Sequence, residues 1–280
     1  MKYACGITLY NPTDDIVERI NNYSDVFDLV YLFDNTESKE KHLNFYSELN
    51  KIINKPHIIY LSDSKNCGLP YAFNRIIDIV LKNDIDYLCT LDQDSDFRKE
   101  DIEAVKNYIH THPEQIFPLI APRIIYQNEK FNKEETISVQ RYVIASGSFI
   151  NLYILKESGI RFDENYFIDR FEIDFEKQLQ LSGYNIIQYN GAVLYQELGT
   201  SSGHKHPNHS ELRHYYLFRN RLYYNNKYYS KIKRYLLNIS QTIKHILLIV
   251  LFENNKILKL KQLYPAISDY KKGKMGKRGE

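Results

Sequence analysis

Segments typical of strands and of helices alternate through residues 1–100, and this alternation constrains the fold more than any other feature of the chain. The strand-like segments are short and apolar, whereas the helix-like segments carry apolar side chains three or four residues apart. Strands are predicted at residues 2–10, 29–33, 57–61 and 87–91, and helices at residues 13–23, 41–53 and 68–81. This order predicts an α/β fold in which helices flank a mostly parallel central sheet on both faces.

Polar side chains follow each of the four predicted strands at the point where it ends. They are Thr8, Tyr10 and Asn11 after the first strand, Asp34 and Asn35 after the second, residues 63–66 after the third and residues 92–95 after the fourth. Turns favour Asp and Asn in any protein, so one such group alone is weak evidence. Because ligands bind beyond the carboxyl ends of parallel strands, the four groups together predict a ligand site at this edge.

The rest of the chain is less regular. Strands are expected at residues 117–125, 141–152 and 186–194, a helix at residues 172–182, and further helices from about residue 210. A chain of 280 residues is near the upper limit for one hydrophobic core. We therefore expect one α/β domain over residues 1–229 and a basic helical extension over residues 230–280 that ends in a disordered tail.

The charge is distributed unevenly. Residues 230–280 contain 12 Lys and Arg against 3 Asp and Glu, while the remainder contains 25 against 32. Within this extension, residues 231–252 carry apolar side chains at helical spacing, with cationic residues on or near the other face. Such a helix either packs on the core or lies in an anionic membrane interface, and the basic tail favours the membrane. No nucleic-acid partner is expected.

The cysteine pattern and the N-terminus bear on location. Cys5, Cys67 and Cys89 are widely spaced and form no CxxC pair, which indicates a reducing compartment without disulfides. The first residues lack the long apolar region of a signal peptide. No run reaches the roughly 18 consecutive apolar residues of a spanning helix. We expect a cytoplasmic protein, peripheral at the inner face of the plasma membrane.

The sharpest motif is Asp92-Gln93-Asp94 at the end of the fourth strand. Two carboxylates separated by one residue in extended backbone point roughly the same way, so they can hold Mg²⁺ or Mn²⁺. Phosphate oxygens and water would complete the coordination of the cation. A solvated acidic turn is the alternative, and the preceding apolar strand favours the metal site.

A second group of carboxylates, Asp169, Glu172 and Asp174, lies among aromatic residues where a helix is predicted to begin. A carboxylate beside apolar rings has its charged form disfavoured, which makes it a better base. Such a base can take a proton from an attacking hydroxyl. Ordinary acidic decoration of a helix N-terminus explains the same pattern.

The stretch from Gly199 to His209 is rich in Gly and Ser and contains three histidines, including His204. It is typical of a mobile loop that closes over a diphosphate, and its spacing is not diagnostic of zinc. Further on, Arg219 follows several aromatic residues. Its guanidinium is a candidate for neutralising phosphate, and a helix-surface arginine is the alternative.

Seven segments in this order resemble the rhamnosyltransferase-like branch of the inverting family 2 glycosyltransferases, which have a GT-A fold. The resemblance runs from Thr8 to about Asn220, and the matching segments are TLYNP, LFDN, NCGLPYAFN, LDQDS, ASGSFI, FIDRFEIDF and YYLFRN. Each segment alone is loosely defined, whereas their order and spacing together are specific.

The resemblance implies roles for individual residues of the donor site. Thr8, Tyr10 and Asp34 would surround the base and ribose, and Asn66 would line the donor site. Asp92 would face the ribose and metal, and Asp94 would ligate the metal. Ser146, Gly147 and Ser148 would form the floor of the sugar and acceptor pocket.

The resemblance also implies that Glu172 is the catalytic base and Asp174 its acidic companion. The family base is usually Asp, so the carboxylate of Glu172 would sit one methylene farther out. Family members often have a His before the position of Gly199, and this chain has Gln196-Glu197-Leu198 there. This chain therefore lacks the family's metal or phosphate ligand at that position, and His204 is the candidate to replace it.

The expected activity is transfer of a rhamnose-like or galactofuranose-like sugar from a dTDP- or UDP-sugar to an acceptor hydroxyl. An oligosaccharide or lipid-linked acceptor in bacterial polysaccharide or glycolipid assembly is expected. Two alternatives remain. One is a nucleotidyltransferase, although no Gly-rich, cationic N-terminal loop is present to hold a triphosphate. The other is a non-catalytic membrane scaffold that keeps the fold.

Overall fold

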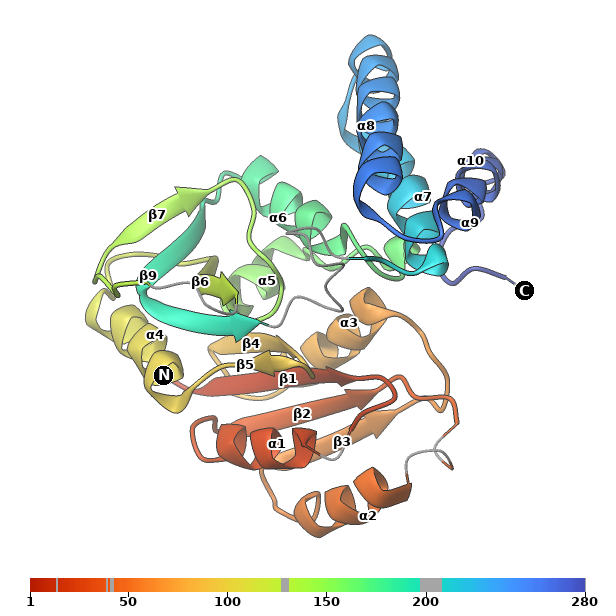
Figure 1. Cartoon of the computed structure of the whole chain (residues 1–280). Coiled ribbons are helices and arrows are strands. Elements are labelled where there is room, and N and C mark those ends of the chain that lie inside the picture. The colour runs from red at the N-terminus through yellow and green to blue at the C-terminus, as the bar shows by residue number, and fades with distance from the viewer. Residues whose placement is uncertain (14, 39, 41–42, 127–130, 197–207, 280) are drawn as a thin grey trace. The chain divides into compact units, whose positions relative to one another are not determined.

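The computed structural model describes residues 1–13, 15–38, 40, 43–126, 131–196 and 208–279 (Figure 1). The chain divides into two compact units. The first comprises Met1–Asp163 and Phe175–Glu197, and the second comprises Glu164–Asp174 and Leu198–Glu280. Each unit contains its own cluster of buried hydrophobic side chains.

The first unit begins with the predicted alternation of strands and helices. The elements are β1 (Tyr3–Leu9), α1 (Ile16–Ser24), β2 (Leu29–Asp34), α2 (Leu43–Ile52), β3 (Ile58–Ser62), α3 (Leu69–Val80) and β4 (Tyr87–Asp92). Strands β1 to β4 are all parallel, in the order β3-β2-β1-β4. The α/β fold expected from the sequence is therefore confirmed.

The second half of this unit adds mixed strands to the same sheet. Its elements are β5 (Ser95–Asp96), α4 (Lys99–Thr111), β6 (Leu119–Tyr126), β7 (Ile137–Gln140), β8 (Ser148–Asn151), α5 (Leu152–Ser158), most of α6 (Phe171–Leu181) and β9 (Ile186–Gln196). The sheet continues as β4-β8-β6-β9-β5, with β7 also paired to β9. Strand β8 is antiparallel to both β4 and β6.

One predicted strand is shorter than expected. The sequence predicts a strand over residues 141–152, whereas β8 occupies only Ser148–Asn151. A turn precedes it, because Gly147 has a positive φ of 81° and its N–H donates to the carbonyl of Thr90 at 2.7 Å. An apolar run alone does not reveal such a turn.

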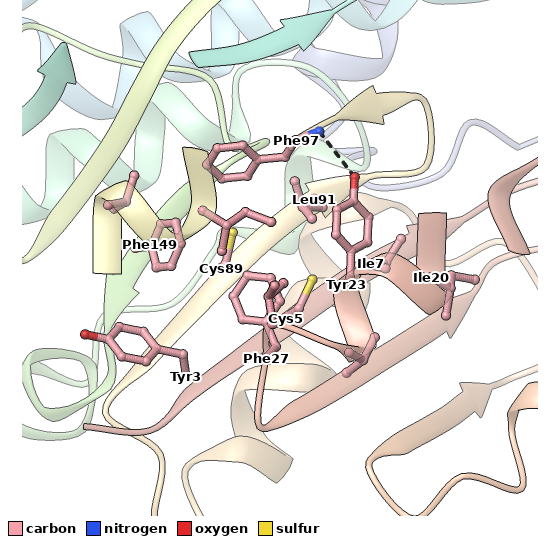
Figure 2. Packing of buried hydrophobic residues seen from close by; sticks show 14 of the residues in the cluster. Tyr3, Cys5, Ile7, Ile20, Tyr23, Phe27, Cys89, Leu91, Phe97 and Phe149 are labelled. Carbon is pink, nitrogen blue, oxygen red and sulfur yellow. Dashed lines mark hydrogen bonds between the residues drawn. The ribbon is translucent and has the colours of Figure 1, made fainter. Parts of the chain in front are cut away.

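One large core cluster of the first unit lies on the face of the sheet that α1, α2 and α4 cover. Alternate side chains of β1, such as Cys5 and Ile7, point to this face and meet Ile20 and Tyr23 of α1 (Figure 2). The hydroxyl of Tyr23 accepts a hydrogen bond from the N–H of Phe97 and donates to the carbonyl of Ser95. This pair of bonds attaches α1 to the chain that follows β4. Figure 1 shows α3 on the opposite face of β1 to β4.

The second unit is helical. It contains the short 3-10 helix Glu164–Tyr166, the first turn of α6, and the helices α7 (Glu211–Tyr228), α8 (Lys231–Phe252), α9 (Lys256–Lys261) and α10 (Leu263–Lys271). The buried cluster combines α7 with side chains from the later helices and from residue 167. The sequence places a domain boundary at residue 229, whereas in the structure α7 belongs with α8 to α10.

The last residues of the chain differ from the disordered tail that the sequence predicts. The N–H of Gly276 donates to the carbonyl of Asn165 at 2.8 Å, and the guanidinium of Arg219 donates to the carbonyl of Gly276 at 2.8 Å. The N–H of Arg278 donates to the hydroxyl of Tyr216 at 2.9 Å. These partners hold the backbone of a basic, Gly-containing segment whose composition alone predicts disorder.

Candidate functional site

The carboxyl ends of β1 to β4 are aligned, as the sequence predicts. Leu9 pairs in register with Asp34, Asp34 with Ser62, and Thr8 with Asp92. The polar residues that follow these strands therefore emerge at one edge of the sheet. This is the edge at which parallel α/β sheets bind ligands.

The middle residue of the D-x-D motif fastens the motif to the end of β1. The side-chain Oε1 of Gln93 accepts a hydrogen bond from the N–H of Tyr10 at 2.8 Å, and its Nε2 donates to the carbonyl of Tyr10 at 3.1 Å. Arg19 of α1 donates to the carbonyl of Gln93 at 2.9 Å. The sequence did not assign a role to Gln93, because the middle position of D-x-D carries no residue preference. It did not assign one to Arg19 either, because this residue lies 74 positions away in the sequence.

The two carboxylates of the motif have different surroundings. Asp92 is half-buried, and its N–H donates to the Oγ of Ser146 at 3.0 Å. Ser146 is itself bonded to the Oγ of Ser95 at 2.6 Å. Asp94 is exposed, and within the part of the chain that the structure describes its carboxylate has no hydrogen-bond partner. Asp94 is therefore available to a ligand.

The carboxylates of Asp92 and Asp94 suit a hard divalent cation that also binds a substrate. Among the described residues, no three His, Cys, Asp or Glu side chains come together to hold a metal ion. Mg²⁺ is commonly held by one or two carboxylates, with water and substrate phosphates in the remaining positions. The donor set thus fits a cation whose coordination is completed by a diphosphate.

Asp34 is fully buried, and its carboxylate organises the neighbouring elements. It accepts hydrogen bonds from the N–H of Thr36 at 2.8 Å, the hydroxyl of Tyr46 at 2.6 Å and the hydroxyl of Tyr60 at 2.5 Å. Burial, followed by the hydrogen bond to Asp34, raises the pKa of both tyrosines. They therefore remain protonated donors, and the sequence did not single out either of them.

A second side-chain amide holds the loop that contains Asn66. Oδ1 of Asn35 accepts from the N–H of Cys67 at 3.1 Å, and its Nδ2 donates to the carbonyl of Gly68 at 3.3 Å. Oδ1 of Asn66 accepts from the N–H of Gly68 at 3.1 Å. Gly68 has a positive φ of 88° and is the residue directly before α3. The N-terminus of this helix therefore lies at the loop. The free N–H groups and dipole at a helix N-terminus favour anions.

The Ser146-Gly147-Ser148 turn is tightly packed. A Cβ on Gly147 would lie 3.0 Å from Cγ of Pro122, and the positive φ of this residue also favours Gly. Since Ser146 contacts the N–H of Asp92, the turn supports the D-x-D motif from the adjacent strand β8. The sequence did not predict this pairing of the segment with the motif's strand, and the role of Ser146, Gly147 and Ser148 toward a sugar stays a prediction.

In the second unit, the two predicted catalytic carboxylates differ in accessibility. Asp174 is fully buried, and it accepts from the hydroxyl of Tyr166 at 3.0 Å and pairs with Nζ of Lys227 at 2.9 Å. Glu172 is half-buried in the first turn of α6. Asp174 has the contacts of a structural ion pair, and Glu172 is the more accessible of the two.

The loop before Glu172 has an uncommon backbone. Three non-glycine residues, Phe167, Asp169 and Arg170, have φ angles of 65°, 58° and 69°. Such conformations cost about 1–3 kcal/mol each and persist only where surrounding structure enforces them. The side chain of Asn220 does so here, because its Nδ2 donates to the carbonyls of residues 166, 168 and 169 at 2.9, 2.6 and 3.1 Å. The start of α6 is thus held in one conformation.

Arg219 is buried, and its guanidinium donates within the second unit. It reaches the carbonyl of Gly276 at 2.8 Å, those of Lys274 and Tyr166 at 3.4 Å, and Oδ1 of Asn220 at 3.2 Å. These contacts tie the C-terminal segment to the loop before α6. They give Arg219 a structural role, and the predicted contact with phosphate is still only a prediction.

Part of the predicted site lies outside the described residues. These are residues 197–207, which include Glu197, Leu198 and His204. Gln196 ends β9, where it pairs with Ser95 next to the D-x-D motif. Of the three predicted loop histidines, only His209 is described, and its N–H donates to Oε2 of Glu253 at 3.3 Å.

No protein-family model and no curated protein sequence matches this chain. Solved structures do match. They include S. aureus TarS residues 1–349 with UDP-GlcNAc, at 13% identity and a TM-score of 0.59 over 96% of this chain and 80% of that one. TarS 1–349 alone matches at 15% identity and a TM-score of 0.58, again over 96% and 80%. GalNAc-T7 with UDP, GalNAc and Mn²⁺ matches at 10% identity and a TM-score of 0.57, over 70% of this chain and 44% of that one. The chain has the GT-A fold that these glycosyltransferases share.

Proposed function

We propose that the protein is an inverting glycosyltransferase that moves a sugar from a nucleoside diphosphate donor to an acceptor hydroxyl. The observation that carries the proposal is the exposed, unpartnered carboxylate of Asp94 at the carboxyl end of β4 within the described structure. Gln93 and Ser146 hold the turn that presents it. The GT-A fold, shared with structures that contain UDP or UDP-GlcNAc, supports the same assignment.

Donor binding is assigned to the first unit. Asp94, with Asp92 beside it, would hold Mg²⁺ or Mn²⁺, which when bound neutralises charge on the diphosphate of the leaving group. Residues at the same edge are assigned to the nucleotide. They are Thr8, Tyr10, Asp34 and Asn66.

Glu172 is assigned as the base. It takes the proton of the acceptor hydroxyl as the acceptor oxygen forms its bond to the anomeric carbon. The bond from that carbon to the phosphate oxygen breaks, and the nucleoside diphosphate leaves with the electron pair. Asp174, whose charge Lys227 offsets, supports the start of α6 beside the base.

The donor and acceptor follow from the family resemblance. We infer a hexosyltransferase of the rhamnosyltransferase-like branch of family 2, which uses a rhamnose-like or galactofuranose-like donor carried by dTDP or UDP. UDP-sugars are the first donors to test, because the structural neighbours contain UDP. The acceptor is an oligosaccharide or a lipid-linked precursor of bacterial polysaccharide or glycolipid. The protein then works in the cytoplasm, at the inner face of the plasma membrane.

Donor binding tests the proposal directly. Melting temperatures are measured with dTDP-, UDP- and GDP-sugars, with and without Mn²⁺. A ligand at about 100 times its dissociation constant stabilises the fold by about 2.7 kcal/mol, which gives a clear shift. We expect a metal-dependent shift with one nucleotide class that Asp94→Asn abolishes. Asp96→Asn is the matched control, since Asp96 is an exposed carboxylate two residues further on.

The outcomes separate the alternatives. Release of a nucleoside diphosphate and a glycosylated acceptor supports the proposal. Release of pyrophosphate from a nucleoside triphosphate would identify a nucleotidyltransferase instead. The absence of a shift with every donor would indicate a scaffold that keeps only the fold.

A further inference from the structure

Helix α8 faces its own unit with polar side chains and faces outward with apolar ones. It runs over Lys231–Phe252. Among the described residues, it is the helix that is long and apolar enough to cross a membrane. Only 6% of its apolar 18-residue stretch is nevertheless buried in the structure. On its inner side, the backbone carbonyl of Gln241 and the hydroxyl of Thr242 accept hydrogen bonds from Arg221 of α7, and the side-chain oxygen of Gln241 accepts one from Asn225. Packing in the core of the described structure therefore does not account for the apolar face of α8.

The outward face carries a continuous apolar stripe. Its members are spaced three or four residues apart, as one face of a helix requires. They are Ile232, Leu236, Ile239, Ile243, Leu247 and Val250, and all are exposed. The N-terminal part of this stripe lines a shallow groove. An apolar patch of this length on a soluble protein indicates a surface that another apolar phase covers.

Charge decides which phase that is. Helix α8 contains Lys231, Lys233, Arg234 and Lys244 and no acidic residue. If two copies paired through the stripe, Lys233 and Lys244 at its edge would lie at the contact without an opposite charge on either helix. An anionic lipid surface is attracted to the same cations.

The polar inner side rules out a spanning orientation. Because α7 packs along α8, a membrane-spanning α8 would take Arg221 and His245 of this interface into the hydrocarbon. Both are bonded to each other across the two helices, at 3.3 Å between a guanidinium nitrogen and Nδ1. Charged groups in hydrocarbon are costly, and α7 carries four Lys and Arg side chains in all, namely Arg213, Arg219, Arg221 and Lys227.

We propose that α8 lies in the plane of an anionic membrane, with the apolar stripe inserted at the boundary between headgroups and acyl chains. Lys233 and Lys244 remain at the level of the headgroups, as long cationic side chains beside an apolar face do. Helix α8 is then the surface by which the protein binds at the membrane location proposed above, and its role rests on that proposed function. Its test needs neither donor nor acceptor, so failure of docking and failure of glycosyl transfer are distinguishable.

The experiment is flotation of the full chain with phosphatidylcholine vesicles and with vesicles that also contain phosphatidylglycerol. We expect binding to the anionic vesicles, weakened by high salt. The double substitution Leu236→Glu and Leu247→Glu removes two inserted side chains and adds two negative charges. It should lower the partition constant by about tenfold or more, given what burial of each leucine contributes.

The control is the same double substitution at two leucines of other helices, Leu43 and Leu181. These are 68% and 66% exposed, against 60% and 52% for Leu236 and Leu247. The control should bind as the wild type does, and circular dichroism confirms that both variants are folded. Lys233→Gln with Lys244→Gln should weaken binding to anionic vesicles specifically.

Three results would overturn the proposal. One is equal loss of binding in the control variant. Another is binding to neither vesicle, or equal binding to both regardless of salt. The third is a dimer in sedimentation without lipid that the Leu236→Glu and Leu247→Glu variant abolishes, which would make a second copy the occupant of the stripe.

Discussion

The side-chain amide of Gln93 pairs with both backbone polar groups of Tyr10, at 2.8 and 3.1 Å. The two residues are 83 positions apart in the sequence. Their pairing sets the direction in which Asp92 and Asp94 leave the end of β4. The middle position of the motif is therefore part of the machinery that presents the carboxylates.

Replacement of Gln93 by Ala should loosen this turn. Loss of two hydrogen bonds at a half-buried position should cost about 1–2 kcal/mol of unfolding free energy. The affinity for Mn²⁺ with a nucleoside diphosphate should fall by about tenfold, because a misplaced carboxylate pair no longer matches the ligand. Denaturant unfolding and calorimetric titration measure the two effects.

Gln188→Ala is the control for Gln93→Ala. Gln188 also uses its side-chain amide in a hydrogen bond, to Asn190 at 2.8 Å, and lies on β9 away from the motif. It should leave nucleotide affinity unchanged. Equal affinity in Gln93→Ala and the wild type would show that the pairing has no part in ligand binding.

Glu172 and Asp174 should respond differently to amidation. Glu172→Gln should lower turnover by about 10²–10⁴-fold, the usual loss of a general base, with donor affinity and melting temperature preserved. Asp174→Asn should instead destabilise the second unit by about 1–3 kcal/mol, because it weakens the ion pair with Lys227 and the bond from Tyr166. Single-turnover assays and thermal unfolding separate the two. Normal turnover by Glu172→Gln would move the assignment to Asp169.

Asn220 should be essential for the loop before α6. Asn220→Ala removes three donations to backbone carbonyls in a buried place, and three positive φ angles then lose their restraint. We expect a loss of about 2–4 kcal/mol of stability and reduced turnover with donor affinity retained. Asn226→Ala on the exposed side of α7 is the control and should change stability by less than about 0.5 kcal/mol.

The second unit should lose stability in acid because of a buried chain of hydrogen bonds. Arg221 approaches Nδ1 of His245 at 3.3 Å, His245 approaches His214 at 2.9 Å, and His214 approaches Glu253 at 2.9 Å. Arg221 can only donate, so each histidine in turn must be neutral and donate to the next group. Burial, followed by the charge of Arg221, lowers the pKa of His245 to about 3. Burial likewise lowers the pKa of His214.

The sign of the pH effect follows from these shifts. Between the ordinary histidine pKa of 6.5 and about 3, the unfolded chain binds protons that the folded chain does not. Stability should therefore be full above pH 6.5 and fall as the pH drops through this window. Melting temperatures of the wild type across the window measure the effect. His245→Phe should flatten the profile, whereas His110→Gln, at an exposed histidine of α4, should leave it unchanged.

Much of the first unit could be predicted from local sequence. Each of the first four strands is a short apolar run that ends in polar residues, and each intervening helix has its own periodicity. Neighbouring residues thus specify the elements, and the right-handed βαβ connection specifies their parallel order. The D-x-D motif and the Asn66 loop were found for the same reason, because they follow such strands directly.

The sequence by itself determined the α/β alternation, the edge at which the polar residues meet, and the existence and ends of the helix over residues 231–252. Only the tertiary structure decided that Gln93 binds Tyr10, that Asp34 is enclosed by Tyr46 and Tyr60, and that the basic tail is held by Arg219. It also decided that the apolar side of α8 faces outward. These features depend on hydrogen bonds and packing between residues far apart in the chain, whereas composition and periodicity record only what near neighbours favour.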